Sequence, residues 1–258
     1  MQWSSLRVIA KKEIIYASRR PVYWVSSVLL VIFVIWLSVS AATGAIQNIA
    51  QTSSDLADYL ARIYPQMFFL LQPFSLFLLM SLYLFSEIFI MEKAQGRLEM
   101  LMTAPITVKN IWLGKSVSLL VLVYPFVLLT EVLYAVVWVY TAKGLVPTPF
   151  AVTAPTLLIG VLLGPMLAFA IISLLGLISF VAEQVSTVQL SAFFMSFGAA
   201  FGGSYLLSWL QKRLFVQRAD LIRWPMVVGA LVLIGLIGGV MWVLQKRIEK
   251  DRIARTFG

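Results

Sequence analysis

The chain has no cysteine and no histidine among its 258 residues. Without cysteine there is no disulfide framework, no thiolate nucleophile and no Cys-ligated metal. Without histidine the chain lacks the usual haem and zinc ligand and the side chain that most readily carries a proton near neutral pH. Charged residues are also scarce, at 12% of the chain, against roughly 25% in ordinary soluble domains. These absences argue against a soluble domain and against the common catalytic constellations.

The residues that are present are mostly apolar. They make up 61% of the chain, and the mean hydropathy is +0.94, so the sequence predicts a membrane protein. The net charge of +9 does not indicate nucleic-acid binding, because the charges lie at the ends of apolar runs. There they act as topology signals and contact lipid headgroups. No stretch is polar enough for a soluble domain, so we expect a single membrane domain over residues 1–258.

Six apolar runs are long enough to cross a bilayer, which takes about 20 residues. The expected spans are 22–45, 64–91, 111–140, 155–182, 188–207 and 224–244. Before them, an apolar helical face indicates an amphipathic interfacial helix, carried by Trp3, Leu6, Ala10, Ile14 and Ala17. A basic topogenic tail is the alternative for residues 1–20. The expected fold class is an all-α membrane protein with six transmembrane helices and an N-terminal interfacial helix.

The distribution of basic residues predicts the orientation of the spans. With both termini inside, 14 of the 20 Lys and Arg residues lie on the cytoplasmic side, as the positive-inside rule requires. Segment 208–223 opposes this locally, because it places four basic residues outside. We expect this segment to be a short external or re-entrant helix at headgroup level. Alternatively, one of the six spans is misplaced.

The stretch between spans two and three holds a short helix candidate, Arg97 to Thr103. Its apolar face follows the helical spacing i, i+3, i+4, i+7, at Leu98, Leu101, Met102 and Pro105. Gly96 is suited to break the incoming helix, and a proline at position 105 does not continue the short one. A groove on a soluble partner is one place to bury this Met-rich surface. A capped interfacial turn between two spans is the other interpretation.

The same stretch resembles the loop of type-two ATP-binding-cassette exporter permeases. The resemblance is carried by a Glu, a Gly, a Leu-Glu pair and a Pro before the third span, at Glu92, Gly96, Leu98, Glu99, Leu101, Pro105 and Lys115. Arg97 departs from the pattern, where Thr or Ser is common. The resemblance implies a short cytoplasmic coupling helix that docks into an ATPase subunit.

The resemblance also implies the partners. Two copies of an ATPase subunit, which bind ATP and Mg, face two permeases, and the second permease is either identical or homologous. It implies a multi-pass protein of the cell's inner membrane, in contact with membrane lipid, with both termini cytoplasmic. The implied function is export of an amphipathic substrate such as a lipid, glycolipid, drug or peptide. The alternative is a non-transporting scaffold or mechanotransmission subunit of a similar complex.

The segment Leu113-Gly114-Lys115-Ser116 resembles the end of a phosphate-binding loop. That motif requires a glycine five positions before Gly114, where this chain has Lys109. We therefore expect no nucleotide site, no cofactor and no enzyme activity in this chain. Lys115 either marks the membrane boundary or pairs with a nearby carboxylate.

Glu131 is the clear ionisable residue inside an expected span. A carboxylate in hydrocarbon is expensive, so it should face protein, water or a cation. One interpretation places Glu131 on a substrate or gating path. The other is a residue near the outer interface with a paired or protonated side chain.

Overall fold

The computed structural model describes residues 3–50, 54–97, 100, 106–143, 152–181, 184, 186, 190, 194, 198 and 224–257. The elements within these residues are all helical, which confirms the predicted all-α class. The helices are α1 (Trp3–Ser18), α2 (Pro21–Ala50), α3 (Ser54–Phe85), the π-helix η1 (Ser86–Ile90), α4 (Met91–Ala94), α6 (Val108–Ala142), α7 (Ala154–Leu157), the π-helix η2 (Leu158–Leu163), α8 (Gly164–Val181) and α10 (Trp224–Phe257).

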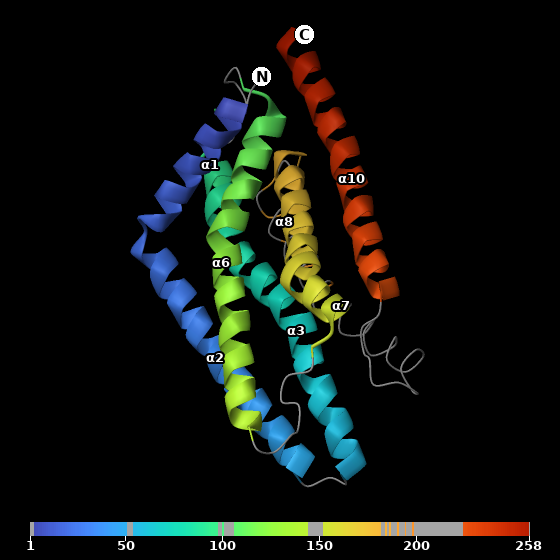
Figure 1. Cartoon of the computed structure of the whole chain (residues 1–258). Helices are drawn as coiled ribbons and strands as arrows, with labels where there is room; N and C mark the ends of the chain where they lie inside the picture. The colour runs from blue at the N-terminus through green and yellow to red at the C-terminus, as the bar shows by residue number, and fades with distance from the viewer. Residues whose placement is uncertain are drawn as a thin grey trace.

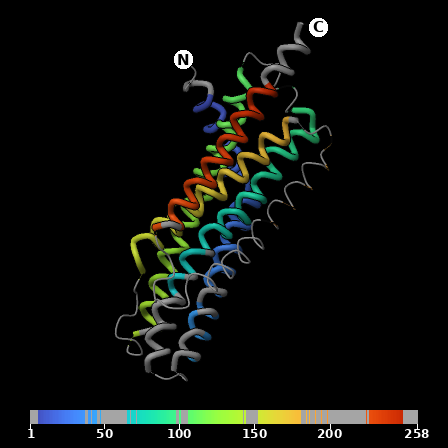
Figure 2. The backbone as a smooth tube through the Cα atoms, turned by 90° about the vertical axis from the view of Figure 1, so that its right-hand side faces the viewer, coloured from blue at the N-terminus to red at the C-terminus, as the bar shows by residue number. Residues whose placement is uncertain are grey.

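The helices form an elongated bundle around α6 (Figure 1). Helix α6 packs against α1, α2, α3 and α8, and α10 lies along α8. Figure 2 shows the same neighbours from the side. The start of α1 and the end of α10 lie at the same end of the bundle (Figure 1).

Four helical segments are long and apolar enough to cross a membrane: Phe68–Ala94, Val108–Thr141, Ala154–Phe180 and Met226–Ile248. Leu6–Ser18 and Pro21–Trp36 meet at a bend of 76° and count as a fifth only if the pair is one span. These segments support a membrane protein. The expected span 188–207 and the basic segment 208–223 lie almost entirely outside the described residues.

Two helices extend beyond the spans expected from hydropathy. Helix α2 continues to Ala50, and α3 already begins at Ser54, although residues 46–63 read as a polar connection. Hydropathy marks the part of a helix that lies in hydrocarbon. The helix itself continues through polar residues while its backbone hydrogen bonds remain internal. The basic tail from Gln245 is also helical, because α10 runs to Phe257.

The core lies where α3, η1, α6 and α8 meet. Phe77, Phe85 and Phe89 are fully buried there, together with Leu119 from α6 and Leu175 from α8. Glycine allows close approach at two points of this packing. A Cβ atom on Gly160 would lie 2.0 Å from the carbonyl oxygen of Phe69, and one on Gly176 would lie 3.0 Å from the Phe89 ring. Gly160 therefore lies at a close contact between η2 and α3.

Candidate functional site: an ion cluster between α1, α4 and α6

Lys115 is fully buried near the start of α6, with 0% of its side chain exposed. Its ammonium nitrogen lies 2.5 Å from Glu92 Oε2, 3.1 Å from Glu13 Oε1 and 3.1 Å from the carbonyl oxygen of Ile88. An ammonium group has three N–H donors, so each donor has an acceptor. The Phe89 ring adds a cation–π contact, with its centroid 5.7 Å from the nitrogen.

Lys12 completes a group of two cations and two anions. Its ammonium nitrogen lies 3.4 Å from Glu13 Oε1 and 3.7 Å from Glu92 Oε1. We name Lys12, Glu13, Glu92 and Lys115 the ion cluster. The two positive and two negative charges balance, which lets Glu13 stay 98% buried, with 2% of its side chain exposed. A buried charge without such compensation is costly.

A π-helix shapes the side of the site contributed by α3 and α4. In η1 the backbone N–H of Met91 donates to the carbonyl of Ser86, five residues earlier. The i to i+5 spacing of a π-turn brings residues five apart toward one face. Glu87 and Glu92 are five apart, and both bind cations near α1: Glu87 pairs with Arg20, and Glu92 with the ion cluster. Arg20 also donates to the Tyr16 hydroxyl.

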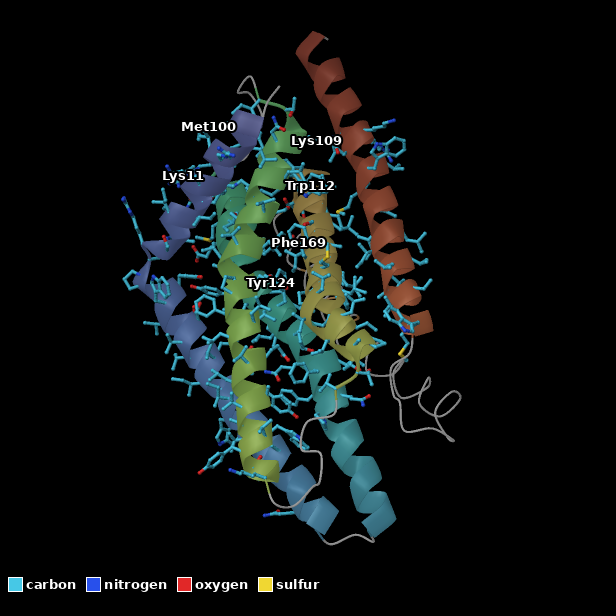
Figure 3. The ribbon with its side chains drawn as sticks, in the orientation of Figure 1. Lys11, Met100, Lys109, Trp112, Tyr124 and Phe169 are labelled. Atoms are coloured by element: carbon cyan, nitrogen blue, oxygen red, sulfur yellow. The ribbon has the colours of Figure 1, made fainter. Side chains whose placement is uncertain are left out.

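Helix α8 accepts hydrogen bonds from α4 and α6 beside the ion cluster. Lys93 of α4 donates to the carbonyl of Ser179 at 2.6 Å, and the indole N–H of Trp112 donates to the carbonyl of Ser173 at 2.8 Å. Trp112 lies between α6 and α8 in Figure 3. Segment α4 is thus tied to α8 directly and to α1 and α6 through the ion cluster.

The expected coupling stretch begins immediately after the ion cluster. Helix α4 ends at Ala94, and Gly96 has a φ of 67°, the left-handed conformation that favours glycine at helix ends. Arg97 and Met100 are exposed, and the backbone N–H of Met100 donates to Gly96 O at 3.3 Å. Met100 lies at the same end of the molecule as Lys11 and Lys109 (Figure 3). The remaining expected contact residues lie outside the described residues: Leu98, Glu99, Leu101, Met102 and Pro105.

Glu131 is not part of this site. It lies 16 positions after Lys115 on α6, roughly 24 Å along the helix axis at the α-helical rise of about 1.5 Å per residue. Its side chain is buried, with 3% exposed, and neither carboxylate oxygen has a hydrogen-bond partner among the described residues. One turn further, the Tyr134 ring stacks on Phe68 of α3, with ring centroids 3.6 Å apart. Glu131 is therefore a buried carboxyl group between helices.

The sequence predicts part of this site. The loop pattern includes Glu92, and the expectation that Lys115 pairs with a carboxylate is confirmed. The predicted site residues do not include Glu13, although the sequence carries a signal for it. It lies three or four residues from Ala10 and Ala17 on the face expected to be apolar, and a lone acid on such a face needs a cation.

The ion pairs of the site connect α1, α4 and α6. The residues that the structure describes hold no cluster of three potential metal ligands of the Cys, His, Asp and Glu types. The acids of the site are paired with lysine and arginine.

No family model matches the chain, and no curated protein matches its sequence.

Proposed function

We propose that this chain is the membrane-spanning permease subunit of an ATP-driven exporter of the ATP-binding-cassette class. A separate ATPase subunit binds ATP and Mg, in two copies, and a second permease, identical or homologous, completes the complex. The substrate is an amphipathic molecule: a lipid, glycolipid, drug or peptide. The protein resides in the cell's inner membrane with both termini in the cytoplasm.

One observation carries the proposal. Glu92 belongs to the loop that resembles the family's coupling segment, and it is bound to Lys115, which also binds Glu13. A displacement of the loop therefore acts on α1 and α6 at once. The contact between Lys93 and the Ser179 carbonyl extends the same displacement to α8.

The proposed mechanism follows from these contacts. ATP binding closes the partner ATPases and moves the coupling segment that begins after Gly96. The ion cluster passes this movement to α1, which lies at a 76° bend to α2. Because Lys115 is fully buried and has an acceptor for each of its donors, sliding one helix past another at this point costs broken charge-assisted hydrogen bonds. The helices are thus expected to move as a unit.

The coupling segment itself provides the test. Burial of a large apolar side chain is worth about 1.5–3 kcal/mol. Leu98→Ala combined with Leu101→Ala should therefore weaken binding of the ATPase by at least about tenfold, since 1.4 kcal/mol is a factor of ten. The measurement is co-purification of the ATPase with the full chain, alongside ATPase rate in lipid. Glu99→Lys should uncouple hydrolysis from transport by reversing a charge at the contact.

The control is a double variant of the same chemistry elsewhere. Leu231→Ala combined with Leu236→Ala alters exposed leucines on α10 and should leave ATPase binding unchanged. Full retention of binding and coupled activity in the Leu98 and Leu101 variant contradicts the proposal and leaves an interhelical turn. ATPase binding without movement of any amphiphile across the membrane indicates the scaffold or mechanotransmission subunit instead.

A further inference from the structure

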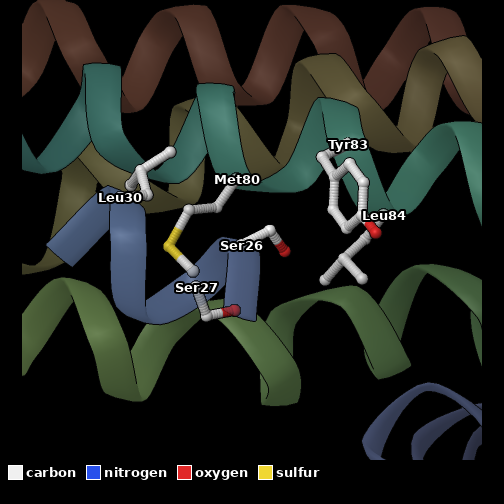
Figure 4. A pocket seen from close by; sticks show the side chains of 6 residues that line it. All are labelled: Ser26, Ser27, Leu30, Met80, Tyr83 and Leu84. Atoms are coloured by element: carbon white, nitrogen blue, oxygen red, sulfur yellow. The ribbon is translucent and has the colours of Figure 1, made fainter. Parts of the chain in front are cut away.

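A hollow lies between α2 and α3 on the side of the bundle near α1. Its volume is about 180 Å³, and it is lined by Ser26, Ser27, Leu30, Met80, Tyr83 and Leu84. In Figure 4 the Met80 side chain reaches from α3 toward α2, beside Leu30 and Ser27. Part of the lining reaches the surface, because Tyr83 is 37% exposed and Ser26 and Leu30 are partly exposed. The hollow is therefore a groove on the surface of a membrane bundle.

The lining is unsuited to water. A buried water needs two to four polar partners, whereas an apolar cavity of about 150 Å³ stays dry and takes up hydrocarbon. The polar side chains of the lining are Ser26, Ser27 and Tyr83, and Ser26 Oγ already donates to the carbonyl of Tyr23 at 3.1 Å. Leu30, Met80, Leu84 and the Tyr83 ring form the apolar wall, and methionine adapts its shape to a flexible ligand. A hydrocarbon chain fits this lining.

A second hollow adjoins the groove on the side where Arg20 and Glu87 lie, and we call this side the ionic end. It shares Tyr83 and Leu84 with the groove and is otherwise lined by Tyr16, Ala17, Arg20, Tyr23, Glu87 and Ile88. Its volume of about 20 Å³ is enough for one small polar group, since about 10–15 Å³ on this measure holds a water. The two hollows together run from an arginine at the bend between α1 and α2 to an apolar pocket deeper along α2. The combined site is charged at one end and mostly apolar at the other, as an amphiphile is.

The charges at the ionic end favour an anionic group. Arg20 has five N–H donors and is 43% exposed on its side chain, while its bonds to Glu87 and Tyr16 use two of its nitrogens. The preceding residue, Arg19, is exposed, so the bend between α1 and α2 carries two arginines. The planar guanidinium matches the geometry of phosphate oxygens. Arginine at a membrane edge is a common contact for lipid phosphate.

We propose that this composite groove binds one phospholipid of the leaflet nearest α1, with an acyl chain between α2 and α3 and its phosphate on Arg20. The site needs only the membrane character of the chain, so it does not depend on the proposed function or on an ATPase partner. It is also separate from the ion cluster, because none of the four cluster residues lines either hollow.

A photoreactive lipid tests the proposal on the purified full chain in phosphatidylcholine bilayers. The first probe is phosphatidylglycerol with a diazirine near the end of one acyl chain. The second is diacylglycerol with the same chain but no phosphate. We expect phosphatidylglycerol to label the peptides holding Leu30 and Met80 about tenfold more efficiently than diacylglycerol, because charge-assisted hydrogen bonds add affinity. Unlabelled phosphatidylglycerol should compete. Equal labelling by both probes overturns the proposal, since the groove then holds any hydrocarbon chain.

Three matched variants separate the two ends of the site. Arg20→Gln should remove the advantage of phosphatidylglycerol, whereas Arg19→Gln should keep most of it, and Glu87→Gln should retain or increase it by removing a competing anion. Ser26→Phe should fill the groove and abolish labelling there, while Ser40→Phe on the exposed part of the same helix should not. Unchanged labelling in both Arg20→Gln and Ser26→Phe overturns the proposal. The comparison of two probes on the unmodified chain decides the case if a variant fails to fold.

Discussion

The ammonium nitrogen of Lys115 on α6 lies 2.5 Å from Glu92 Oε2 on α4, in a contact where the lysine side chain is fully buried. The two side chains lie between neighbouring helices rather than on a surface that would face lipid. Breaking a buried ion pair by removing one partner costs more than the pair contributes, because the other charge stays buried. The contact therefore fixes the relative position of the two helices.

Lys115→Met is expected to destabilise the folded chain by about 3–5 kcal/mol, the usual cost of leaving a buried charge without its partner. It deprives both Glu13 and Glu92 of the same cation. The measurement is tryptophan fluorescence during thermal unfolding in detergent. Lys109→Met is the control, because Lys109 is exposed on the same helix.

A compensated variant checks that interpretation. Lys115→Met combined with Glu13→Gln and Glu92→Gln removes the two acids together with the lysine, and it should recover part of the lost stability. A compensated variant less stable than Lys115→Met alone contradicts the assignment of the loss to unpaired carboxylates.

Gly160→Ala is expected to destabilise the bundle by about 1–3 kcal/mol, the typical cost of overpacking. The added methyl group would lie 2.0 Å from the Phe69 carbonyl oxygen, so the backbones of η2 and α3 must separate. The same substitution at Gly235, where nothing lies within 4 Å, should be neutral or gain up to about 1 kcal/mol from helix propensity. Equal unfolding temperatures for the two variants would show that the helices separate at no cost.

If Glu131 lies on a substrate or gating path of the proposed exporter, Glu131→Gln is expected to leave assembly intact and to alter transport or substrate-stimulated ATPase activity. The substitution keeps the shape of the side chain and removes a buried carboxyl group that has no hydrogen-bond partner among the described residues. Glu131→Leu should raise the unfolding temperature, because an unsatisfied buried polar group costs about 1–3 kcal/mol. Unchanged activity in both variants assigns Glu131 a structural role only.

The orientation of the chain can be measured by single-cysteine labelling, since the chain contains no cysteine. Cysteines at positions 50 and 145 should react with an impermeant reagent from outside, and those at 97, 185 and 252 only after the membrane is opened. The positive-inside distribution is the reason. External labelling at 97 reverses the topology and removes the coupling segment from the cytoplasm.

Much of the fold follows from the sequence, because hydrophobic length is a direct physical requirement of the bilayer. Helix α6 begins three residues before its expected span, and α10 begins at the expected residue. The C-terminal end of α2 and the start of α3 do not match their expected spans, since helices continue into polar sequence where hydropathy carries no signal. The π-helices η1 and η2 have no hydrophobic periodicity of their own and were not predicted.

The site is harder to derive from sequence than the fold. Hydropathy places Lys115 at a membrane boundary, but it does not say which acid lies beside it. Glu13 is 102 residues away along the chain, and only the packing of α1 on α6 brings the two together. The lone acid on the apolar face of α1 is the signal that identifies half of the pair. Its partner depends on tertiary structure.

The separation between Glu13 and Lys115 has a consequence for biosynthesis. Helix α1 leaves the ribosome before α6, and its Glu13 meets the buried lysine only after 102 further residues have been made. Until then α1 carries an acid on its apolar face without that partner, so it remains at the water boundary rather than sinking into the bilayer. Once α6 has been made, Lys115 pairs with that acid and α1 packs against α6. Helix α1 is thus held at its final position by a residue that is translated long after it.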